Sequence, residues 1–386
     1  MIYLDHNATS PLDGRARELM EPYLDCANPS SVHRAGRRAR DAVEQAREQV
    51  AGLVGVQSNQ VIFTSGGTEA NNLAIAGIAE ANLPGAIAVS AVEHPSVLEP
   101  AQALSRHGWS LVTLSVDREG RVDLGALGDQ ITPATRMVSV MGANNETGVV
   151  QPIAELAEFA HSRGLPFHSD AAQVAGKLPL VFSDYGADAI TLSAHKLNGP
   201  KGAGALIVDK TLDLQPLLRG GGQERGLRSG TENVAAIVGF GAAAELAGTE
   251  RAVRSQTTTA LREHLLARLA EIPGTRVFGD SAPRLPNTVM FALPGIDGET
   301  TLLQLDRLGF AVSSGSACHS ASPDPSHVLM AMGEAREVAF GAVRVSFGHA
   351  NEHAHVDALI EALQKILRTL APGLMEQVPA NTVSVA

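Results

Sequence analysis

The chain has 386 residues, of which 44% are hydrophobic and 18% are charged, and its formal net charge is −11 at pH 7. This length suits one large domain with a smaller one, and the composition is ordinary for a globular protein. The acidic balance argues against a nucleic-acid-binding or anionic-membrane surface. A basic stretch from Arg34 to Arg47 is interleaved with acidic residues, which predicts a solvated helix face.

Cysteine content and the N-terminal segment bear on localisation. Only Cys26 and Cys318 occur, which excludes a disulfide framework and fits a reducing compartment. The first ten residues, MIYLDHNATS, lack the basic and apolar regions of a signal peptide, and no apolar run reaches membrane-spanning length. We therefore expect a cytoplasmic protein without a membrane partner.

Short β-rich runs alternate with helical patterns between about residues 40 and 250. Amphipathic stretches such as Glu69–Ala81 and Ile153–Ser162 lie between the β-rich runs. The alternation predicts an α/β fold with a doubly wound, mainly parallel sheet. The predicted buried strands are Val61–Thr64, Ala86–Ser90, Leu111–Ser115, Met137–Met141, Pro166–Ser169, Ala189–Ser193 and Gly204–Val208.

The pattern changes beyond about residue 255. A helical segment, Arg254–Ala270, precedes two further strand candidates, Thr288–Phe291 and Val343–Phe347, and a terminal helix, His355–Leu370. We predict a large domain of residues 15–255 and a smaller α/β domain made of residues 1–14 and 256–386. The tail from Pro372 is expected to be loosely ordered.

Ligands of doubly wound sheets bind where strand ends meet loops, so the residues that follow each strand are informative. Val61–Thr64 runs into a glycine turn that contains Gly67 and Thr68, and a helical pattern follows. Free N–H groups at such a helix start can bind a phosphate, and the threonine can add a hydroxyl. Plain helix capping is the alternative. No Walker-type lysine follows, which argues against a nucleoside triphosphate loop.

Two more strand ends carry candidate catalytic groups. Asp170 follows a strand and has Gln173 three residues later, so its carboxylate can hold a ring nitrogen protonated, or it can simply cap the next helix. Lys196 is the best Schiff-base candidate among five lysines, because it alone follows a strand that ends in hydrogen-bonding side chains, Ser193 and His195. A surface lysine is the alternative reading.

A small, polar segment without periodicity contains Cys318, and we predict a mobile loop over about residues 312–327. Cysteines are usually buried hydrophobes, but this composition opposes burial. An exposed thiolate is nucleophilic, and His319 or a nearby cation can lower its pKa. Cys26 lacks such a loop and is interpreted as structural.

Together these segments resemble the cysteine desulfurases, pyridoxal phosphate enzymes of the aspartate-aminotransferase-like fold (fold type I, class V aminotransferases). The similarity runs from Tyr3 to about Leu370, and the loop resembles that of the longer-loop class. The matching segments are Tyr3–Thr9, Asn28–His33, Thr64–Asn72, Glu93–His94, Asn144–Gly148, Ser169–Gln173, Ser193–Lys196, Arg225–Asn233 and Ser313–Cys318.

The resemblance implies a role for each matching position. Lys196 would bind the cofactor covalently and move the Cα proton, and Cys318 would take the sulfur as a persulfide. Arg344 and Asn145 would bind the substrate, with Arg344 at its carboxylate and a core ion pair as the alternative for Arg344. The implied cofactor contacts are Asp170 at the ring nitrogen, His94 on the ring face, Asn145 and Gln173 near the phenolic oxygen, and Gly67, Thr68, Ser193 and His195 at the phosphate.

The family also implies partners. Thr231 would reach the phosphate bound by the neighbouring subunit, so a homodimer with shared active sites is expected, and a sulfur-acceptor protein would receive the persulfide. The destination of the sulfur stays open among iron–sulfur cluster assembly, thiolated tRNA, thiocofactors and sulfur-modified DNA. No metal ligand is expected. The alternatives are a selenocysteine lyase or another lyase or aminotransferase of this fold, and a cofactor-free scaffold that binds sulfur carriers.

Overall fold

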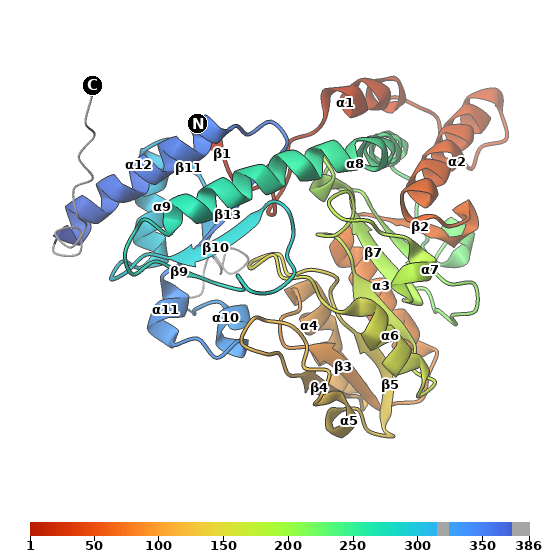
Figure 1. Ribbon diagram of the computed structural model, residues 1–386. Helices are drawn as coiled ribbons and strands as arrows, with labels where there is room; N and C mark the ends of the chain where they lie inside the picture. The colour runs from red at the N-terminus through yellow and green to blue at the C-terminus, as the bar shows by residue number, and fades with distance from the viewer. Residues whose placement is uncertain (315–323, 373–386) are drawn as a thin grey trace.

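The computed structural model describes residues 1–314 and 324–372, in which helices and strands alternate along the chain (Figure 1). The strands are β1 Ile2–Tyr3, β2 Val61–Thr64, β3 Ala86–Ser90, β4 Ser110–Leu114, β5 Thr135–Ser139, β6 Phe167–Asp170, β7 Ala189–Ser193, β8 Gly204–Val208, β9 Arg276–Val277, β10 Thr288–Ala292, β11 Phe310–Ala311, β12 Ser313–Ser314 and β13 Ala342–Ser346. The helices are α1 Gly14–Met20, α2 Arg34–Val54, α3 Gly67–Glu80, α4 Pro95–Ala103, α5 Leu127–Gln130, α6 Ile153–His161, α7 Phe182–Tyr185, α8 Val234–Leu269, α9 Gly298–Arg307, α10 His327–Ala331, α11 Arg336–Phe340 and α12 His353–Leu370.

A seven-stranded sheet forms the centre of the larger part of the molecule. Its strand order is β2-β8-β7-β6-β5-β3-β4, and β8 runs antiparallel to both of its neighbours while the other pairings are parallel. The predicted doubly wound, mainly parallel sheet is therefore confirmed. Strands β2, β3, β7 and β8 have the predicted bounds.

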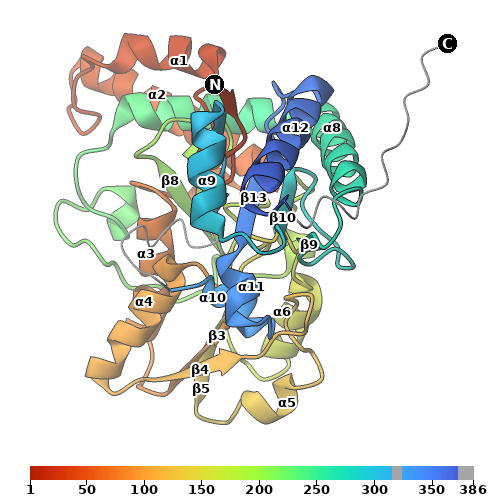
Figure 2. The same cartoon turned by 90° about the vertical axis from the view of Figure 1, so that its left-hand side faces the viewer.

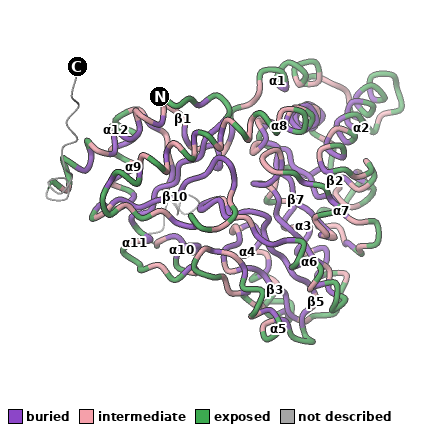
Figure 3. The backbone as a smooth tube through the Cα atoms, viewed as in Figure 1, coloured by how far each residue is buried: buried purple, intermediate pink, exposed green. Residues whose placement is uncertain are grey.

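Helices cover both faces of this sheet because alternate strand residues point to opposite sides. Ile62 packs into the core beneath α3 and α4, whereas Val61 and Phe63 pack into the core beneath α2, α6 and α8. Figure 2 shows α3 and α4 on one side of β3–β5 and α6 on the other. Buried residues follow the strands, and exposed residues lie on the outer turns of the helices (Figure 3).

A second, four-stranded antiparallel sheet with the order β12-β13-β10-β9 has its own hydrophobic core. That core combines Leu4 with residues from Leu261 onward, so the chain's start packs with its C-terminal part. Strand β1 pairs in parallel with β11, and residues 5–10 then run from this smaller part toward β7. Helix α8 spans both parts of the molecule (Figure 1).

One sequence-based prediction was wrong at a helix boundary, and another was wrong at a single residue. The long helix begins at Val234 and not at Arg254, because its first turns are buried on several sides and show no amphipathic period; Asn233 caps it. The predicted solvated face of residues 34–47 is exposed at Arg37, Arg38 and Arg40, but Arg47 is not part of it. Its side chain is 4% exposed and pairs with the buried Glu224 at 2.6 Å between Nη1 and Oε2, since residues 224–226 fold back onto α2.

The loop prediction over residues 312–327 needs one correction at each end. Ser313 and Ser314 form β12 and pair with β13, and His327 begins α10. Residues 315–323, which include Cys318, lie outside the described residues. Across the described ranges no helix is both long and apolar enough to cross a membrane.

Candidate active site

One cavity of about 590 Å³ lies at the carboxyl ends of the parallel strands of the large sheet, where the chain start and β13 also approach. Ten of the residues singled out from the sequence line it, although they come from six separate chain segments. They are Gly67, Thr68, His94, Asn145, Asp170, Gln173, Ser193, His195, Lys196 and Arg344. Thr231 is exposed and does not line the cavity of its own chain.

One end of the cavity has the features of a phosphate site. Helix α3 begins at Gly67 and directs its N-terminal N–H groups into the cavity. A Cβ at Gly67 would lie only 3.3 Å from the Cβ of Ser193, so glycine allows the helix start to approach the end of β7 closely. The buried Ser193 hydroxyl has no hydrogen-bond partner within the described residues, which leaves it for a ligand.

Lys196 stands at the end of the turn that follows β7. Its Nζ donates hydrogen bonds to the backbone oxygens of Asn7 at 2.5 Å and Ala8 at 2.8 Å, so it is held by carbonyls inside the cavity and is not a surface lysine. Burial, and next the cations Lys196 and Lys201, lower the pKa of His195 to about 4. His195 is therefore neutral at physiological pH and contacts Thr9 Oγ1 through Nδ1 at 3.2 Å.

Asp170 is connected to His94 by a chain of hydrogen bonds through Asn71 and Ser96. Asn71 Nδ2 donates to Asp170 Oδ2 at 2.7 Å and to Ser96 Oγ at 2.8 Å, and Ser96 Oγ lies 2.7 Å from His94 Nδ1. The backbone N–H of Ser96 also donates to His94 Nδ1, so this ring nitrogen is an acceptor. Asp170 Oδ1 accepts from the Ala172 N–H, so the carboxylate also stabilises the turn after β6.

The opposite end of the cavity carries the buried Arg344 on β13. Arg344 Nη2 donates to Asp5 Oδ1 at 2.6 Å and Nη1 donates to the Asn145 carbonyl at 3.0 Å. Its Nε has no partner within the described residues. The guanidinium therefore forms the core ion pair that was the alternative interpretation, while its Nε is left as a donor; the contact with a substrate carboxylate stays a prediction.

Asn7 joins the two parts of the molecule at the cavity and was not singled out from the sequence. Its backbone oxygen accepts from Lys196 Nζ and from Gln173 Nε2, and its side-chain Nδ2 donates to the Asn145 carbonyl and to Thr288 Oγ1. Asn71, Ser96 and Lys177 were also missed. Asn7 and Asn71 lie inside segments that match the family, which is the signal that could have drawn attention to them.

A buried acid borders the guanidinium. Burial raises the pKa of Glu146 to about 7, against the opposing effects of the Ser326 hydrogen bond and the Arg344 charge. Ser326 Oγ donates to Glu146 Oε2, which fixes the start of α10 against the segment that carries Asn145. The chain on the C-terminal side of residues 315–323 is thereby attached to the cavity wall.

The cavity therefore has what a phosphorylated ring cofactor bound to a lysine requires. An unpartnered serine hydroxyl and a helix start can hold a phosphate, a buried carboxylate can hold a ring nitrogen, and a lysine stands between them. Pyridoxal phosphate fits this donor set. Within the described residues no cluster of His, Cys, Asp and Glu has the spacing of a metal site.

Comparisons with known proteins agree. Residues 2–359 match the family described as Aminotransferase class-V, to which the chain belongs. It is 42% identical over 383 residues to "Cysteine desulfurase IscS" of Dictyoglomus turgidum, with 97% of each chain covered. The fold matches a structure titled "NIFS-LIKE PROTEIN" with a TM-score of 0.90, 36% identity and coverage of 96% of this chain and 100% of that one. It also matches "SspA in complex with cysteine" with a TM-score of 0.81 and 31% identity, covering 91% and 100% of the two chains.

These matches place the chain in the cysteine desulfurase group of that family, and its enzymes use pyridoxal phosphate. The predicted fold class, family and cofactor are confirmed. The role of each single residue remains a prediction.

Proposed function

We propose that this chain removes the sulfur atom of L-cysteine, holds it as a persulfide on Cys318 and releases L-alanine. The observation that carries the proposal is that Lys196, Asp170 and Arg344 line one cavity beside an unpartnered phosphate-site hydroxyl. At one site, an arginine can bind the carboxylate of an amino acid while a lysine acts on the proton at its Cα.

Each of these residues of the cavity has a separate role in this reaction. Arg344 orients the substrate carboxylate through its planar guanidinium, which Asp5 and the Asn145 carbonyl hold in place. Bound pyridoxal phosphate supplies an electron sink at the substrate Cα, and Asp170 keeps the ring nitrogen protonated. Lys196 accepts the Cα proton and later returns a proton to carbon, and His94, which lines the same cavity, is a second hydrogen-bonding group.

The sulfur transfer balances without an outside oxidant. The Cys318 thiolate attacks the substrate sulfur, so an S–S bond forms while the Cβ–S bond breaks. The electron pair of the broken bond remains on carbon and takes a proton, which gives alanine, and the sulfur stays on Cys318 as a persulfide. Ser313, five positions before Cys318 in the sequence, pairs with Arg344 in the small sheet. Because Arg344 lines the cavity, this pairing supports the proposal that Cys318 can reach it.

The test is sulfide release from L-cysteine, with dithiothreitol as reductant, by the parent enzyme and by Cys318→Ser. We expect the serine variant to keep the visible absorbance of bound cofactor and to lose sulfide release, and Cys26→Ser to behave like the parent. Sulfide release by Cys318→Ser at the parental rate would exclude Cys318 as the acceptor. Selenocysteine offered to both proteins reports whether selenium release also requires this thiol.

We also propose that the enzyme is a cytoplasmic homodimer that passes its persulfide to an acceptor protein. Thr231 is exposed, and the loop that carries it is attached beside α3 by the Arg228–Glu69 ion pair, 2.8 Å between Nε and Oε1. That position supports a contact with a second copy's cofactor phosphate. Light scattering gives the mass in solution, and Thr231→Ala should weaken cofactor binding only if the dimer shares its sites.

A further inference from the structure

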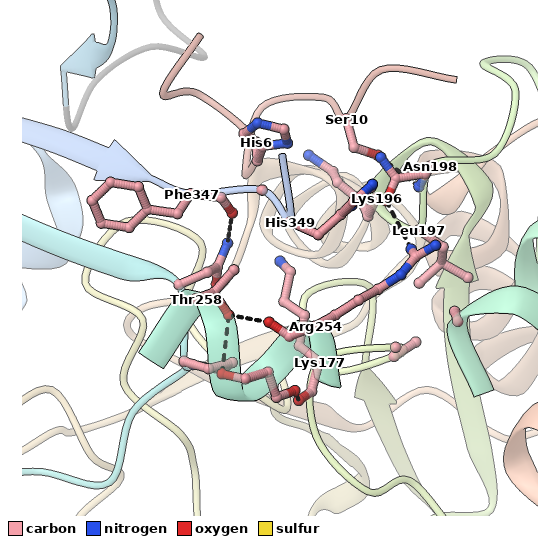
Figure 4. A pocket seen from close by; sticks show the side chains of 17 residues that line it. His6, Ser10, Lys177, Lys196, Leu197, Asn198, Arg254, Thr258, Phe347 and His349 are labelled. Carbon is pink, nitrogen blue, oxygen red and sulfur yellow. Dashed lines mark hydrogen bonds between the residues drawn. The ribbon is translucent and has the colours of Figure 1, made fainter. Parts of the chain in front are cut away.

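A second, smaller cavity of about 60 Å³ shares Lys196 with the active-site cavity (Figure 4). Lys177, Arg254, His6 and His349 also line it, and no Asp or Glu side chain does so within the described residues. The proposed reaction uses neither Lys177 nor Arg254, but Arg254 pairs with Glu250 at 2.6 Å between Nη2 and Oε2, whereas Lys177 contacts active-site residues. Lys177 follows Gln173 by four positions in the turns after β6.

Lys177 makes two defined hydrogen bonds toward the active site. Its Nζ donates to Gln173 Oε1 at 2.6 Å and to Asn7 Oδ1 at 3.2 Å. Burial, and next the cations Lys196 and Arg344, lower its pKa well below the usual value. Whether charged or neutral, the amine donates to the two oxygens, so these contacts do not depend on its protonation state.

These contacts determine how the Gln173 side chain is oriented. Because Lys177 faces the amide oxygen, the Gln173 Nε2 group must lie on the opposite side, where it donates to the Asn7 carbonyl at 3.0 Å. That bond uses one of the two N–H groups of the amide. The second N–H is therefore available to a ligand in the active-site cavity, which Gln173 lines.

We propose that Lys177 is a positioning residue, which fixes the Gln173 amide so that it presents an N–H, and not its oxygen, to the cofactor's phenolic oxygen. The proposal rests on the proposed place of Gln173 beside that oxygen. Lys177 acts from outside the active-site cavity, which Gln173 lines and Lys177 does not.

The expected consequence has a definite sign. The nitrogen that would link Lys196 to the cofactor can share its proton with the neighbouring phenolic oxygen. An N–H donated by Gln173 stabilises the phenolic oxygen in place of that shared proton. The pKa of the linking nitrogen is therefore lower when the donor is present. Removing Lys177 frees the amide to rotate and weakens the donor. Where Lys177 is protonated, its removal also takes away a positive charge near Lys196, Arg344 and His6, which acts in the same direction. Both effects raise the pH midpoint of the cofactor's visible absorbance.

The experiment is a pH titration of the absorbance of the cofactor-loaded enzyme without cysteine, comparing the parent with Lys177→Met. We expect the midpoint to rise by about one pH unit. Lys210→Met is the matched control, since Lys210 Nζ donates to Gln57 Oε1 at 2.6 Å on an exposed surface remote from the cavity, and its midpoint should equal the parental one. An unchanged midpoint in a folded, cofactor-loaded Lys177→Met would overturn the proposal.

Two further variants separate orientation from charge. Lys177→Arg keeps N–H donors for Gln173 and Asn7, and the adjacent cavity gives space for the larger side chain. This variant should return the midpoint toward the parental value. In a Gln173→Ala background, Lys177→Met should shift the midpoint by less than half as much as in the parent. An equal shift in that background would show that charge alone acts and would overturn the role assigned to Gln173. Because no cysteine is present, these results do not depend on whether Cys318 accepts sulfur.

Discussion

The two ends of the active-site cavity are built in different ways. At the phosphate end, Gly67 and Thr68 are the first two residues of α3, which follows β2 after a short turn, and Ser193 ends a strand of the same sheet. At the carboxylate end, Arg344 meets Asp5, which is 339 positions away in the sequence, and the Asn145 carbonyl, which is 199 positions away. The first end is a local motif on a rigid sheet, and the second is assembled from three distant segments.

This difference predicts how each end responds to substitution. A change at the phosphate end should weaken cofactor binding and leave the cysteine KM unchanged. A change at the carboxylate end should raise the cysteine KM and leave cofactor binding unchanged. Lys196 lies between the two ends, so its loss should affect both.

Lys196→Ala is expected to have the largest effect. It removes both the covalent attachment of the cofactor and the group that moves the Cα proton, so turnover should fall by at least about 10²–10⁴-fold and the visible absorbance should be lost. Steady-state alanine formation and an absorbance scan measure the two effects. Lys365→Ala, at an exposed position on α12, is the control and should change neither.

Arg344→Lys is expected to have the next largest effect. Lysine keeps the charge but cannot make the two parallel hydrogen bonds of a guanidinium, so the cysteine KM should rise by about 10–100-fold while the cofactor absorbance is retained. Arg268→Lys changes a partly exposed arginine that pairs with Asp357 and serves as the control. Loss of cofactor from Arg344→Lys would show that the two ends are not separable.

Glu146→Gln tests the buried acid beside Arg344. Its folded-state pKa of about 7 lies above the ordinary value of 4.5, so the folded protein binds the extra proton and its stability falls as pH rises between these values. Glutamine does not titrate, so the variant should match the parent near pH 5 and exceed it at pH 8, by up to about 3 kcal/mol.

Urea unfolding of the parent and of Glu146→Gln at both pH values measures this difference. Glu48→Gln, at an exposed position on α2, should show no such dependence. A parental stability that rises relative to Glu146→Gln between pH 5 and pH 8 would contradict the assignment of Glu146 as a raised, buried acid.

Ser193→Ala is expected to have the smallest effect. It removes one neutral hydroxyl donor from the phosphate end. The dissociation constant of the cofactor should therefore rise about 5–10-fold, corresponding to roughly 1 kcal/mol, while the cysteine KM stays unchanged. Equilibrium binding of cofactor to the apoenzyme measures it. Ser169→Ala, at a buried position on β6 that does not line the cavity, should leave cofactor affinity at the parental value.

The same contrast explains what the sequence could predict. Strands β2, β3, β7 and β8 were placed at their bounds because short apolar runs between turn residues are a local signal. Asp170 was recognised at the end of its strand, but its partner Asn71, 99 positions away, was not, because the meeting of these side chains depends on strand order and packing. The start of α8 was missed because a helix buried on several faces has no amphipathic period.

Lys177 shows the same limit within a few residues. Its spacing from Gln173 is short, yet the turn geometry that brings Nζ to the amide oxygen is set by contacts with Asn7 from the other end of the chain. Sequence patterns therefore predict which strand ends carry chemistry, and tertiary contacts decide how those side chains are oriented.

The most direct test of the account is the mass of the Cys318 peptide after one equivalent of L-cysteine is added to the cofactor-loaded enzyme without reductant. We predict a mass increase of one sulfur atom on that peptide, together with one alanine per active site, and neither product in Lys196→Ala. Alanine formed in that amount while the Cys318 peptide keeps its original mass would contradict the transfer of sulfur to this residue.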